Sequence, residues 1–549
     1  MMSPLSFIDL AHQYGGVLWR TDGHAVIDSV SIDTRSLSSG DCFVAIRGDH
    51  FDAHHFLDEA LDAGAQSLVL EEPVQKEVLQ WVVEDSVTAL GQIARENRRL
   101  FDRPLIAITG SNGKTTVKEM LAGILGASGE VLATQGNLNN HIGVPLTLFR
   151  LASNYEYAVV EMGASALGEI EYLCNIAEPD VALVNNVGEA HLEKFGSAEN
   201  IQQAKGEIYA GLKSNGVAVV NLDCVGAATY ISKLEDRKYI SFSVDDVEAD
   251  IYASDIVLDA FSSRFTLHMS GDSQSVELAV PASHNIHNAL AAAACAHALD
   301  VEIEQIRKGL EAFDGVKGRL QKIDGLNGAR IIDDSYNASP TSTKAAVDVL
   351  ASCEGKKILV LGDMGELGEA AARFHEELGD YALMAGIDSL IATGDLSRYA
   401  VDAFGESGAW FATRSELVDY LKAELASDVV LLVKASRSAA MDQVVNDLKS
   451  TVESCHAGLV GRIPIELLFC FQCVQLFVHA RHSWRANGGL DLAMVWCPND
   501  SPIEFFANWP VRSRRWPRDT FGQNRHPDNG RNTHSIGHLR QCVALVRPK

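Results

Sequence analysis

A glycine-punctuated segment between an apolar run and a helical pattern is the part of the sequence that most clearly predicts chemistry. Residues 106–116 read IAITGSNGKTT. The two glycines let the backbone approach a polyphosphate, which successive N–H groups and the start of a helix near Lys114 would face. Lys114 would pair with β- and γ-phosphate oxygens, and Thr115 would bind Mg²⁺. We therefore predict an ATP site formed by Thr109, Gly110, Ser111, Asn112, Gly113, Lys114, Thr115 and Thr116.

This loop departs from the general phosphate-loop pattern at one position. The pattern has a glycine five residues before Gly113, where this chain has Ile108. A strand, turn and helix whose glycines only permit the turn is the alternative interpretation. The GKT sequence directly after an apolar run favours the nucleotide site.

A carboxylate follows another apolar run and could bind the metal of that nucleotide. Glu161 ends the run at 158–160, and ligands bind at the carboxyl edge of parallel sheets. Its oxygens suit Mg²⁺. The alternative is a solvated strand end.

Short apolar runs separated by helical patterns predict the scaffold that positions these residues. The runs at 105–108, 158–160, 181–184 and 217–220 indicate a parallel sheet covered by helices. We assign residues 103–317 to this central ATP-binding domain. A small N-terminal α/β domain, residues 1–102, precedes it, and a Rossmann-like C-terminal α/β domain, residues 318–453, follows it.

The composition excludes several classes of protein. A formal net charge of −27 argues against nucleic-acid binding, because phosphate backbones attract basic surfaces. The N-terminus lacks a basic segment followed by an apolar run, so we expect no signal peptide, no stable membrane insertion and a cytoplasmic location. Of the ten cysteines, those before residue 454 lack paired ligand spacing, and most are interpreted as core residues rather than as disulfides or zinc ligands; they are Cys42, Cys174, Cys224, Cys295 and Cys353.

Several segments together resemble the Mur ligase family of ATP-dependent amino-acid-adding enzymes over residues 25–450. They are TGSNGKTT at 109–116, QGNLNNHIGVPLTL at 135–148, VVEMGAS at 159–165, NNVGEAHLEKFGS at 185–197, AKGEI at 204–208 and HNIHNALAAA at 284–293. DDSYNASPTSTKAA at 333–346 and LVLGDMGELG at 359–368 are similar to the member that adds D-alanyl-D-alanine. The resemblance implies the three-domain architecture, with a monomeric chain, UDP-N-acetylmuramoyl-tripeptide and D-alanyl-D-alanine as partners, and a role in cell-wall peptidoglycan synthesis.

The resemblance also implies roles for residues of the central domain. His191 would take part in a second metal position near the transferring phosphate, beside the Mg²⁺ expected at Thr115 and Glu161. Lys205 would be carbamylated, which turns a cation into an anionic metal ligand. The catalytic residues would then be Lys114, His191, Lys205 and Asp334.

The nucleotide and the dipeptide would be contacted by residues of two further segments. Asn285 and Asn288 would meet the nucleotide, although helix capping is an alternative for both. Arg319 would reach the nucleotide from the third domain. Asp334 would meet the incoming ammonium group, and Asn337 would hydrogen-bond the dipeptide. Ser339 replaces an asparagine that is usual in this segment.

Two other segments would bind substrate at the phosphates and at the uridine diphosphate. Lys434 and Arg437 would close over the phosphates, with Ala435 in place of a usual glycine. The uridine diphosphate would be held by Ser31, Asp33, Thr34 and Arg35. A purely structural turn is the alternative for that Ser- and Asp-rich segment.

The last part of the chain has no counterpart in the family. Residues 454–549 hold half of the prolines and cysteines and four of the seven tryptophans. One choice of codons for residues 513–537, read one base later, resembles the membrane transferase that uses the ligase's product. We predict an aberrant, frameshift-derived and unstructured tail; a genuine appended domain is the alternative.

The implied reaction joins an amine to a carboxylate that ATP first activates as an acyl phosphate. Two alternatives remain for the function. One is a ligase like folylpolyglutamate synthase, which shares the ATP loop and the carbamylated lysine but uses another acceptor. The other is an ATP-binding scaffold that has lost turnover.

Overall fold

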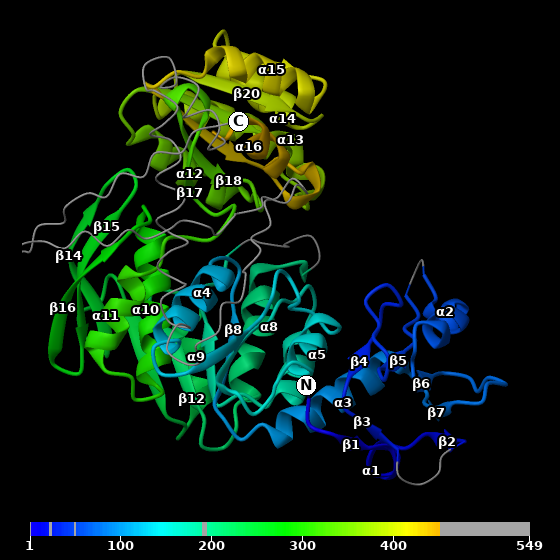
Figure 1. Cartoon of the computed structure of the whole chain (residues 1–549). Coiled ribbons are helices and arrows are strands. Elements are labelled where there is room, and N and C mark those ends of the chain that lie inside the picture. Colours follow the sequence, from blue (N-terminus) through cyan, green and yellow to red (C-terminus); the bar gives the residue numbers. More distant parts are fainter. Residues whose placement is uncertain (1, 21–24, 49–50, 189–194, 451–549) are drawn as a thin grey trace, which may run out of the picture. The chain divides into compact units, whose positions relative to one another are not determined.

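The computed structural model describes residues 2–20, 25–48, 51–188 and 195–450, in which the chain forms successive α/β regions (Figure 1). The predicted tail at 454–549 and the predicted metal ligand His191 lie outside the described residues. The α/β fold class predicted from the sequence is confirmed. No helix of the described part is long and apolar enough to cross a membrane.

The N-terminal region contains a five-stranded sheet in the order β2-β7-β6-β5-β4 and a two-stranded pair, β1 and β3. Its neighbours pair in parallel except β2, which runs antiparallel to β7. Phe7, Phe43 and Trp81 are fully buried and fill its core. The elements are β1 (Leu5–Ser6), α1 (Phe7–Tyr14), β2 (Val17–Trp19), β3 (Val26–Ile27), β4 (Val30–Ser31), β5 (Cys42–Val44), η1 (Ala53–Phe56), α2 (Leu57–Asp62), β6 (Ser67–Leu70), β7 (Leu79–Val82) and α3 (Ser86–Leu100).

The central region is built on a nine-stranded sheet in the order β16-β15-β14-β13-β12-β11-β8-β10-β9. Its elements are β8 (Leu105–Thr109), α4 (Lys114–Leu125), β9 (Glu130–Ala133), α5 (Gly143–Leu148), β10 (Tyr155–Glu161), α6 (Glu169–Ala177), β11 (Val181–Val184), α8 (Ala198–Ala210), β12 (Val217–Asn221), α9 (Ala227–Leu234), β13 (Tyr239–Ser243), β14 (Ile251–Leu258), β15 (Ser263–Met269), β16 (Asp272–Leu278), α10 (Ser283–His297) and α11 (Ile303–Glu311).

Strand β8 shows why its apolar run lies in the middle of this sheet. Successive side chains point to opposite faces, so Leu105 and Ala107 pack in one core while Ile106 and Ile108 pack in another. Helices cover both faces, as a parallel sheet requires. The alanine-rich helix α10 is buried along 288–296, which lets it lie close against α4.

The sheet also extends beyond the parallel strands expected from the sequence. Strands β15 and β16 pair antiparallel to β14 and to each other. Buried and exposed residues alternate along β15 and β16, so one face of these strands is solvated. Such strands carry no continuous apolar run in the sequence, and they are therefore not predicted from it. Ser270 and Gly271 both have positive φ, 54° and 85°, which suits the two-residue turn of a hairpin.

The C-terminal region has a six-stranded sheet in the order β17-β18-β22-β19-β20-β21, parallel except at β17. Its elements are β17 (Gln321–Asp324), η2 (Leu326–Gly328), β18 (Arg330–Asp334), α12 (Pro340–Ala351), β19 (Lys356–Leu361), η3 (Gly368–Ala370), α13 (Ala371–Met384), β20 (Ser389–Thr393), α14 (Ser397–Phe404), β21 (Gly408–Phe411), α15 (Arg414–Glu424), β22 (Val429–Lys434), η4 (Arg437–Ala439) and α16 (Asp442–Leu448).

The ends of β18 and β22 are neighbours, because Asp334 and Lys434 are paired in register. Ser339 is the N-cap of α12, and reciprocal side-chain to backbone hydrogen bonds between Ser339 and Ser342 form a capping box.

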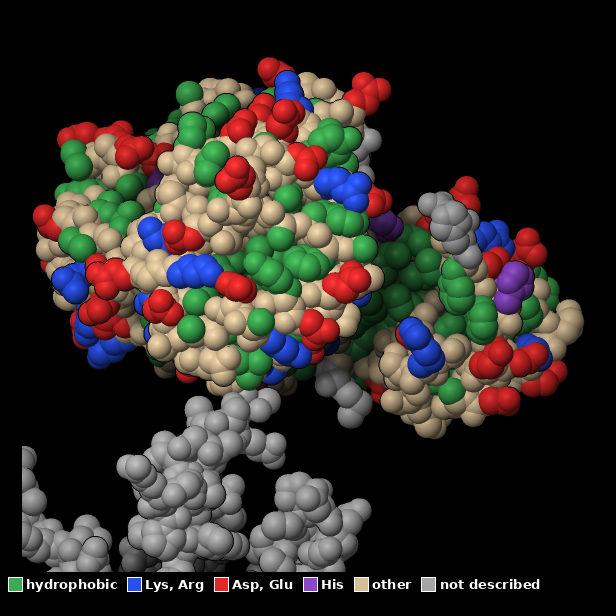
Figure 2. Space-filling model, turned by 90° about the horizontal axis from the view of Figure 1, so that it is seen from above, with side chains coloured by type: hydrophobic (Ala, Val, Ile, Leu, Met, Phe, Trp, Pro, Cys, Tyr) green, Lys and Arg blue, Asp and Glu red, His purple; other side chains and the backbone are tan. Residues whose placement is uncertain are grey.

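Charged side chains are spread over the face shown in Figure 2, with acidic and basic groups interspersed. A single large basic patch is absent from that face, as the acidic composition predicts.

Candidate active site

The predicted phosphate loop lies where β8 passes into α4. Gly113 is the N-cap of α4 and has a φ of 78°, a conformation that favours glycine. A Cβ atom there would lie 2.3 Å from Asn288 Oδ1 and 2.5 Å from Asn185 Nδ2. Only glycine therefore fits at this position. Lys114 begins the helix, and its Nζ donates to Gly110 O at 2.8 Å.

Side-chain amides from α10 and from the segment directly after β11 form hydrogen bonds with the loop and with one another. Asn185 Nδ2 donates to Asn112 O and to Asn288 Oδ1, both at 3.0 Å, and Asn288 Nδ2 donates to Asn285 Oδ1 at 3.3 Å. Asn285 and Asn288 are buried and linked to the loop through Asn185. Their contact with the nucleotide stays a prediction.

A second asparagine after β11 occupies two N–H groups of the loop. Ser111 N–H donates to Asn186 O at 3.0 Å, and Asn112 N–H donates to Asn186 Oδ1 at 2.8 Å. The first N–H groups of α4 have no partner within the helix by geometry. The first turn of α4, which includes Lys114, Thr115 and Thr116, is therefore the part of the loop best suited to an anion.

Oxygen ligands suited to Mg²⁺ meet beside the loop. Thr115 Oγ1 donates to Glu161 Oε2 at 2.9 Å, and Asn139 Nδ2 donates to Glu161 Oε1 at 2.8 Å. The Glu161 N–H donates to Thr134 Oγ1 at 2.9 Å. Glu161 is buried, so it is a fixed carboxylate and not a solvated strand end. Among the described residues no three His, Cys, Asp or Glu side chains gather at one point.

Two lysines of the site have depressed pKa values. Burial, together with the positive charge of Lys114, lowers the pKa of Lys205 to about 7. The pKa of Lys114 is lowered by desolvation, although the Glu161 carboxylate opposes that shift. Lys205 lies on α8 and is 2% exposed. A buried lysine near its neutral form is an available nucleophile, unlike the solvated helix lysine that spacing alone suggests.

The predicted dipeptide residues form a buried ion pair. Lys434 Nζ donates to Asp334 Oδ2 at 2.6 Å and to Asn337 O at 3.0 Å. The two side chains are 14% exposed at Asp334 and 2% at Lys434. Burial raises the pKa of Asp334, while Lys434 and Arg319 oppose the rise. Lys434, predicted to bind substrate near the phosphates, thus bonds Asp334 in this structure.

Arg319 connects the segment before β17 with the phosphate loop. Its Nη2 donates to Thr115 Oγ1 at 3.1 Å. Its Cζ lies 4.4 Å from the centroid of the Tyr336 ring, and that of Arg437 lies 5.3 Å from the same ring. The Tyr336 ring therefore lies within cation–π distance of two guanidinium groups.

The predicted uridine-diphosphate residues form a local turn. Ser31 Oγ donates to Asp33 O at 3.1 Å, and the Arg35 guanidinium pairs with the Asp33 carboxylate at 2.6 Å. The Arg35 guanidinium lowers the pKa of Asp33 to about 2. The Arg35 side chain is 89% exposed and Thr34 is partly exposed. The turn geometry is explained without a ligand, so binding here stays a prediction.

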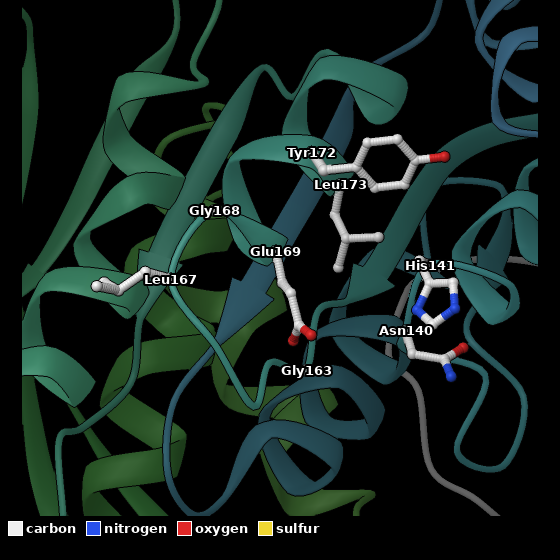
Figure 3. Close-up of a pocket in the computed structure, with 8 residues that line it drawn as sticks. All are labelled: Asn140, His141, Gly163, Leu167, Gly168, Glu169, Tyr172 and Leu173. Atoms are coloured by element: carbon white, nitrogen blue, oxygen red, sulfur yellow. The ribbon is translucent and has the colours of Figure 1, made fainter. Parts of the chain in front are cut away.

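A pocket of about 350 Å³ opens beside the corner formed by Thr115, Asn139 and Glu161 (Figure 3). Glu169 in its wall accepts from Ser165 N–H at 2.6 Å. Asn140 follows Asn139 in the chain, and Gly163 N–H donates to Asn139 O at 2.8 Å, so the pocket adjoins the Glu161 corner. It is lined by Asn140, His141, Gly163, Leu167, Gly168, Glu169, Tyr172 and Leu173.

Sequence reasoning missed several residues that the structure places at the site. Asn139 and Asn185 lie inside segments quoted for the family resemblance, but neither was given a role. Asn185 and Asn186 directly follow β11, and polar residues just past a buried parallel strand are a usable signal. Tyr336 gave no such signal, because aromatic residues are ordinary core components.

Family models match three consecutive parts of the chain. They are described as the Mur ligase family, catalytic domain (residues 26–104), the Mur ligase middle domain (108–296) and the Mur ligase, glutamate ligase domain (318–437).

This chain matches known relatives and solved structures over nearly the whole length of those proteins. The UDP-N-acetylmuramoyl-tripeptide--D-alanyl-D-alanine ligase of Escherichia coli is 42% identical, covering 77% of this chain and 94% of that protein. The Bacillus subtilis ligase of the same name is 34% identical, with coverage of 77% and 93%. MurF from Acinetobacter baumannii has a TM-score of 0.76 at 37% identity, covering 81% of this chain and 99% of that one. The MurF ligase of Thermotoga maritima in complex with ADP has a TM-score of 0.70 at 31% identity, with coverage of 76% and 96%.

Proposed function

The chain belongs to the Mur ligase family, and on that premise we propose that it joins D-alanyl-D-alanine to UDP-N-acetylmuramoyl-tripeptide at the expense of ATP. It is an ATP-dependent amide-bond-forming ligase that releases ADP and phosphate. The product would be the UDP-muramoyl-pentapeptide precursor of peptidoglycan. The observation that carries this function is one chain that combines a phosphate loop next to a buried carboxylate with the buried Asp334–Lys434 pair.

The first step would be attack of the tripeptide carboxylate on the γ-phosphate, giving an acyl phosphate and ADP. Lys114 and the first turn of α4 would stabilise the charge that develops on the transferred group. Thr115 and Glu161 fit a Mg²⁺ ion, because both present hard oxygen atoms at one corner. When bound, the ion would neutralise phosphate charge.

The depressed pKa of Lys205 supports its carbamylation. At neutral pH a large fraction of an amine with a pKa of about 7 is unprotonated, and only that form reacts with CO₂. The resulting carbamate would supply an anionic oxygen ligand in addition to the Glu161 carboxylate. The negative charge of the carbamate would also offset the positive charge of the neighbouring Lys114.

The second step would be attack of the dipeptide amine on the acyl carbon, which expels phosphate. The amine must lose a proton, and a carboxyl group whose pKa is raised accepts one more readily. Asp334 would meet the ammonium group, and Asn337 would hydrogen-bond the peptide. Arg437 and Lys434 would offset phosphate charge near this end.

The UDP-linked substrate would extend from the N-terminal region to the metal corner. Ser31, Asp33, Thr34 and Arg35 would hold its diphosphate. The pocket in Figure 3 has both polar and apolar walls and adjoins Glu161, which suits the muramoyl-peptide end. We propose a cytoplasmic, monomeric enzyme, because its nucleotide-linked substrates are cytoplasmic.

The two alternatives are less well supported. The similarity to named D-alanyl-D-alanine ligases, with 42% identity in one case, disfavours an enzyme like folylpolyglutamate synthase. A scaffold without turnover would not need Lys205 buried beside Lys114.

The test is product formation with purified full-length chain and with a chain ending at Glu453. We expect ADP release only when ATP, UDP-muramoyl-tripeptide and D-alanyl-D-alanine are all present, with one pentapeptide product per ADP by mass spectrometry. Turnover with glutamate and a folate instead of these substrates would contradict the function. ATP binding without any turnover would support the scaffold.

A further inference from the structure

The loop between β19 and α13 is bonded to the end of β22. Residues 362–370 read GDMGELGEA. Gly362 N–H donates to Lys434 O at 2.9 Å, and Gly365 N–H donates to Ser436 Oγ at 2.7 Å. Because Lys434 pairs with Asp334, this loop supports the proposed dipeptide site.

The same loop is anchored on its other side to α14. Asp363 Oδ1 accepts from Ser397 N–H at 2.8 Å and from Ser397 Oγ at 2.7 Å. Between these anchors, Met364 is fully buried and its sulfur lies 3.6 Å from Thr343 Oγ1. The position of the Met364 backbone therefore decides how the loop bridges α14 and β22.

A buried histidine on α13 receives the backbone N–H of Met364. This N–H donates to His375 Nε2 at 2.9 Å, and His375 Nδ1 lies 2.7 Å from Ala371 O. Because Nε2 accepts, the ring proton is on Nδ1, which donates to Ala371 O. The His375 side chain is 0% exposed, and burial lowers its pKa, partly opposed by Asp363. The ring is thus a neutral acceptor with one fixed tautomer.

We propose that His375 is a positioning residue for the incoming dipeptide: Nε2 fixes the Met364 amide, and the loop, which is bonded to Lys434 and Ser436, in turn keeps Lys434 paired with Asp334. This role rests on the proposed function. His375 does not touch the substrate, so its loss changes how well the dipeptide site is formed. The proposed sites of the UDP-linked substrate, the turn at 31–35 and the Glu161 corner, do not include Lys434, so binding of that substrate should be unaffected.

Three substitutions separate the two hydrogen bonds of the ring. His375→Gln keeps an acceptor near the Nε2 position. His375→Asn reaches only as far as Nδ1 and keeps the bond to Ala371 O. His375→Leu fills the space and makes neither bond. The matched control is Leu378→Ala, on the same helix and 1% exposed, which weakens the packing of α13 but leaves the hydrogen bond from His375 to the Met364 amide in place.

The readout is KM for each of the three substrates with the full-length chain. Leaving the Met364 N–H unpaired should raise KM for D-alanyl-D-alanine about tenfold in His375→Leu and His375→Asn. KM for the UDP-linked substrate should not change. His375→Gln should restore the wild-type value, and Leu378→Ala should lower Tm without changing any KM. Hydrogen exchange of the Met364 amide should accelerate in the Leu and Asn variants alone.

Equal dipeptide KM in wild type and His375→Leu, with normal wild-type turnover, would overturn this role and leave the proposed function intact. A rescue by Asn as complete as that by Gln would also overturn it, because the bond to Ala371 would then suffice. Unchanged exchange at Met364 in His375→Leu would contradict the hydrogen bond itself. Wild-type chain without dipeptide-dependent turnover would instead refute the proposed function, and this role with it.

Discussion

The nucleotide site and the dipeptide site are held together by different kinds of interaction. Around the phosphate loop, Asn185, Asn186 and Asn288 form neutral amide hydrogen bonds to the loop and to one another. At the proposed dipeptide site, the Asp334 and Lys434 side chains form a buried ion pair. The phosphate loop should therefore tolerate the loss of the Lys114 charge without a large loss of stability. Removing either Asp334 or Lys434, in contrast, leaves the other charge buried and unpaired, which lowers the free energy of unfolding.

The largest effect should follow the loss of Lys114, and it should be purely catalytic. Lys114→Ala removes the cation that stabilises the transferred phosphoryl group, so ADP release should fall about a hundredfold to a thousandfold. Tm should change little, because desolvation already depresses the pKa of this lysine. Lys213→Ala, a surface ion-pair variant, is the control and should keep its activity. Undiminished product formation by Lys114→Ala would refute the nucleotide site.

The second effect should show the opposite combination, with stability lost together with activity. Asp334→Ala or Lys434→Ala leaves one buried charge unpaired and should cost about 3–5 kcal/mol of unfolding free energy. The double variant should be less destabilised than the sum of the single variants, because no charge remains unpaired. Urea denaturation of all four proteins measures this coupling. Additive effects would mean that the pair carries no interaction energy.

A smaller effect should appear at the metal corner. Glu161→Gln keeps the size of the side chain and removes its charge, so the Mg²⁺ concentration for half-maximal ADP release should rise about tenfold. Glu156→Gln, on the same strand β10 but paired with Arg103 at the surface, is the matched control. Equal Mg²⁺ dependence in the two variants would remove Glu161 from the metal site.

The smallest effect should be a pH-dependent change in stability at Lys205. Its pKa is about 7 in the folded chain against an ordinary value of 10.5, so the unfolded chain binds more protons between these values. Stability should rise with pH across that window, and burial of the charged form should cost most below pH 7. In CO₂-free buffer, Lys205→Met should therefore raise Tm at pH 6 and lose that advantage toward pH 10. A pH-independent difference would contradict the depressed pKa.

Contiguous motifs explain what could be predicted from the sequence. The strand at Leu105–Thr109 and the glycines after it lie within a few residues, so local pattern reveals both the fold and the nucleotide loop. The Asp334–Lys434 pair joins residues 100 positions apart, and no local pattern shows that such side chains meet. The neutral role of His375 depends on burial, which sequence alone does not give.

In the proposed mechanism, the tripeptide carboxylate accepts the γ-phosphoryl group before the dipeptide amine attacks. The direct test labels the terminal carboxylate of UDP-muramoyl-tripeptide with ¹⁸O and follows the label by mass spectrometry. The acyl-phosphate route predicts one ¹⁸O atom in each molecule of released phosphate, because the carboxyl oxygen leaves with it. Unlabelled phosphate from a full turnover would contradict the claim.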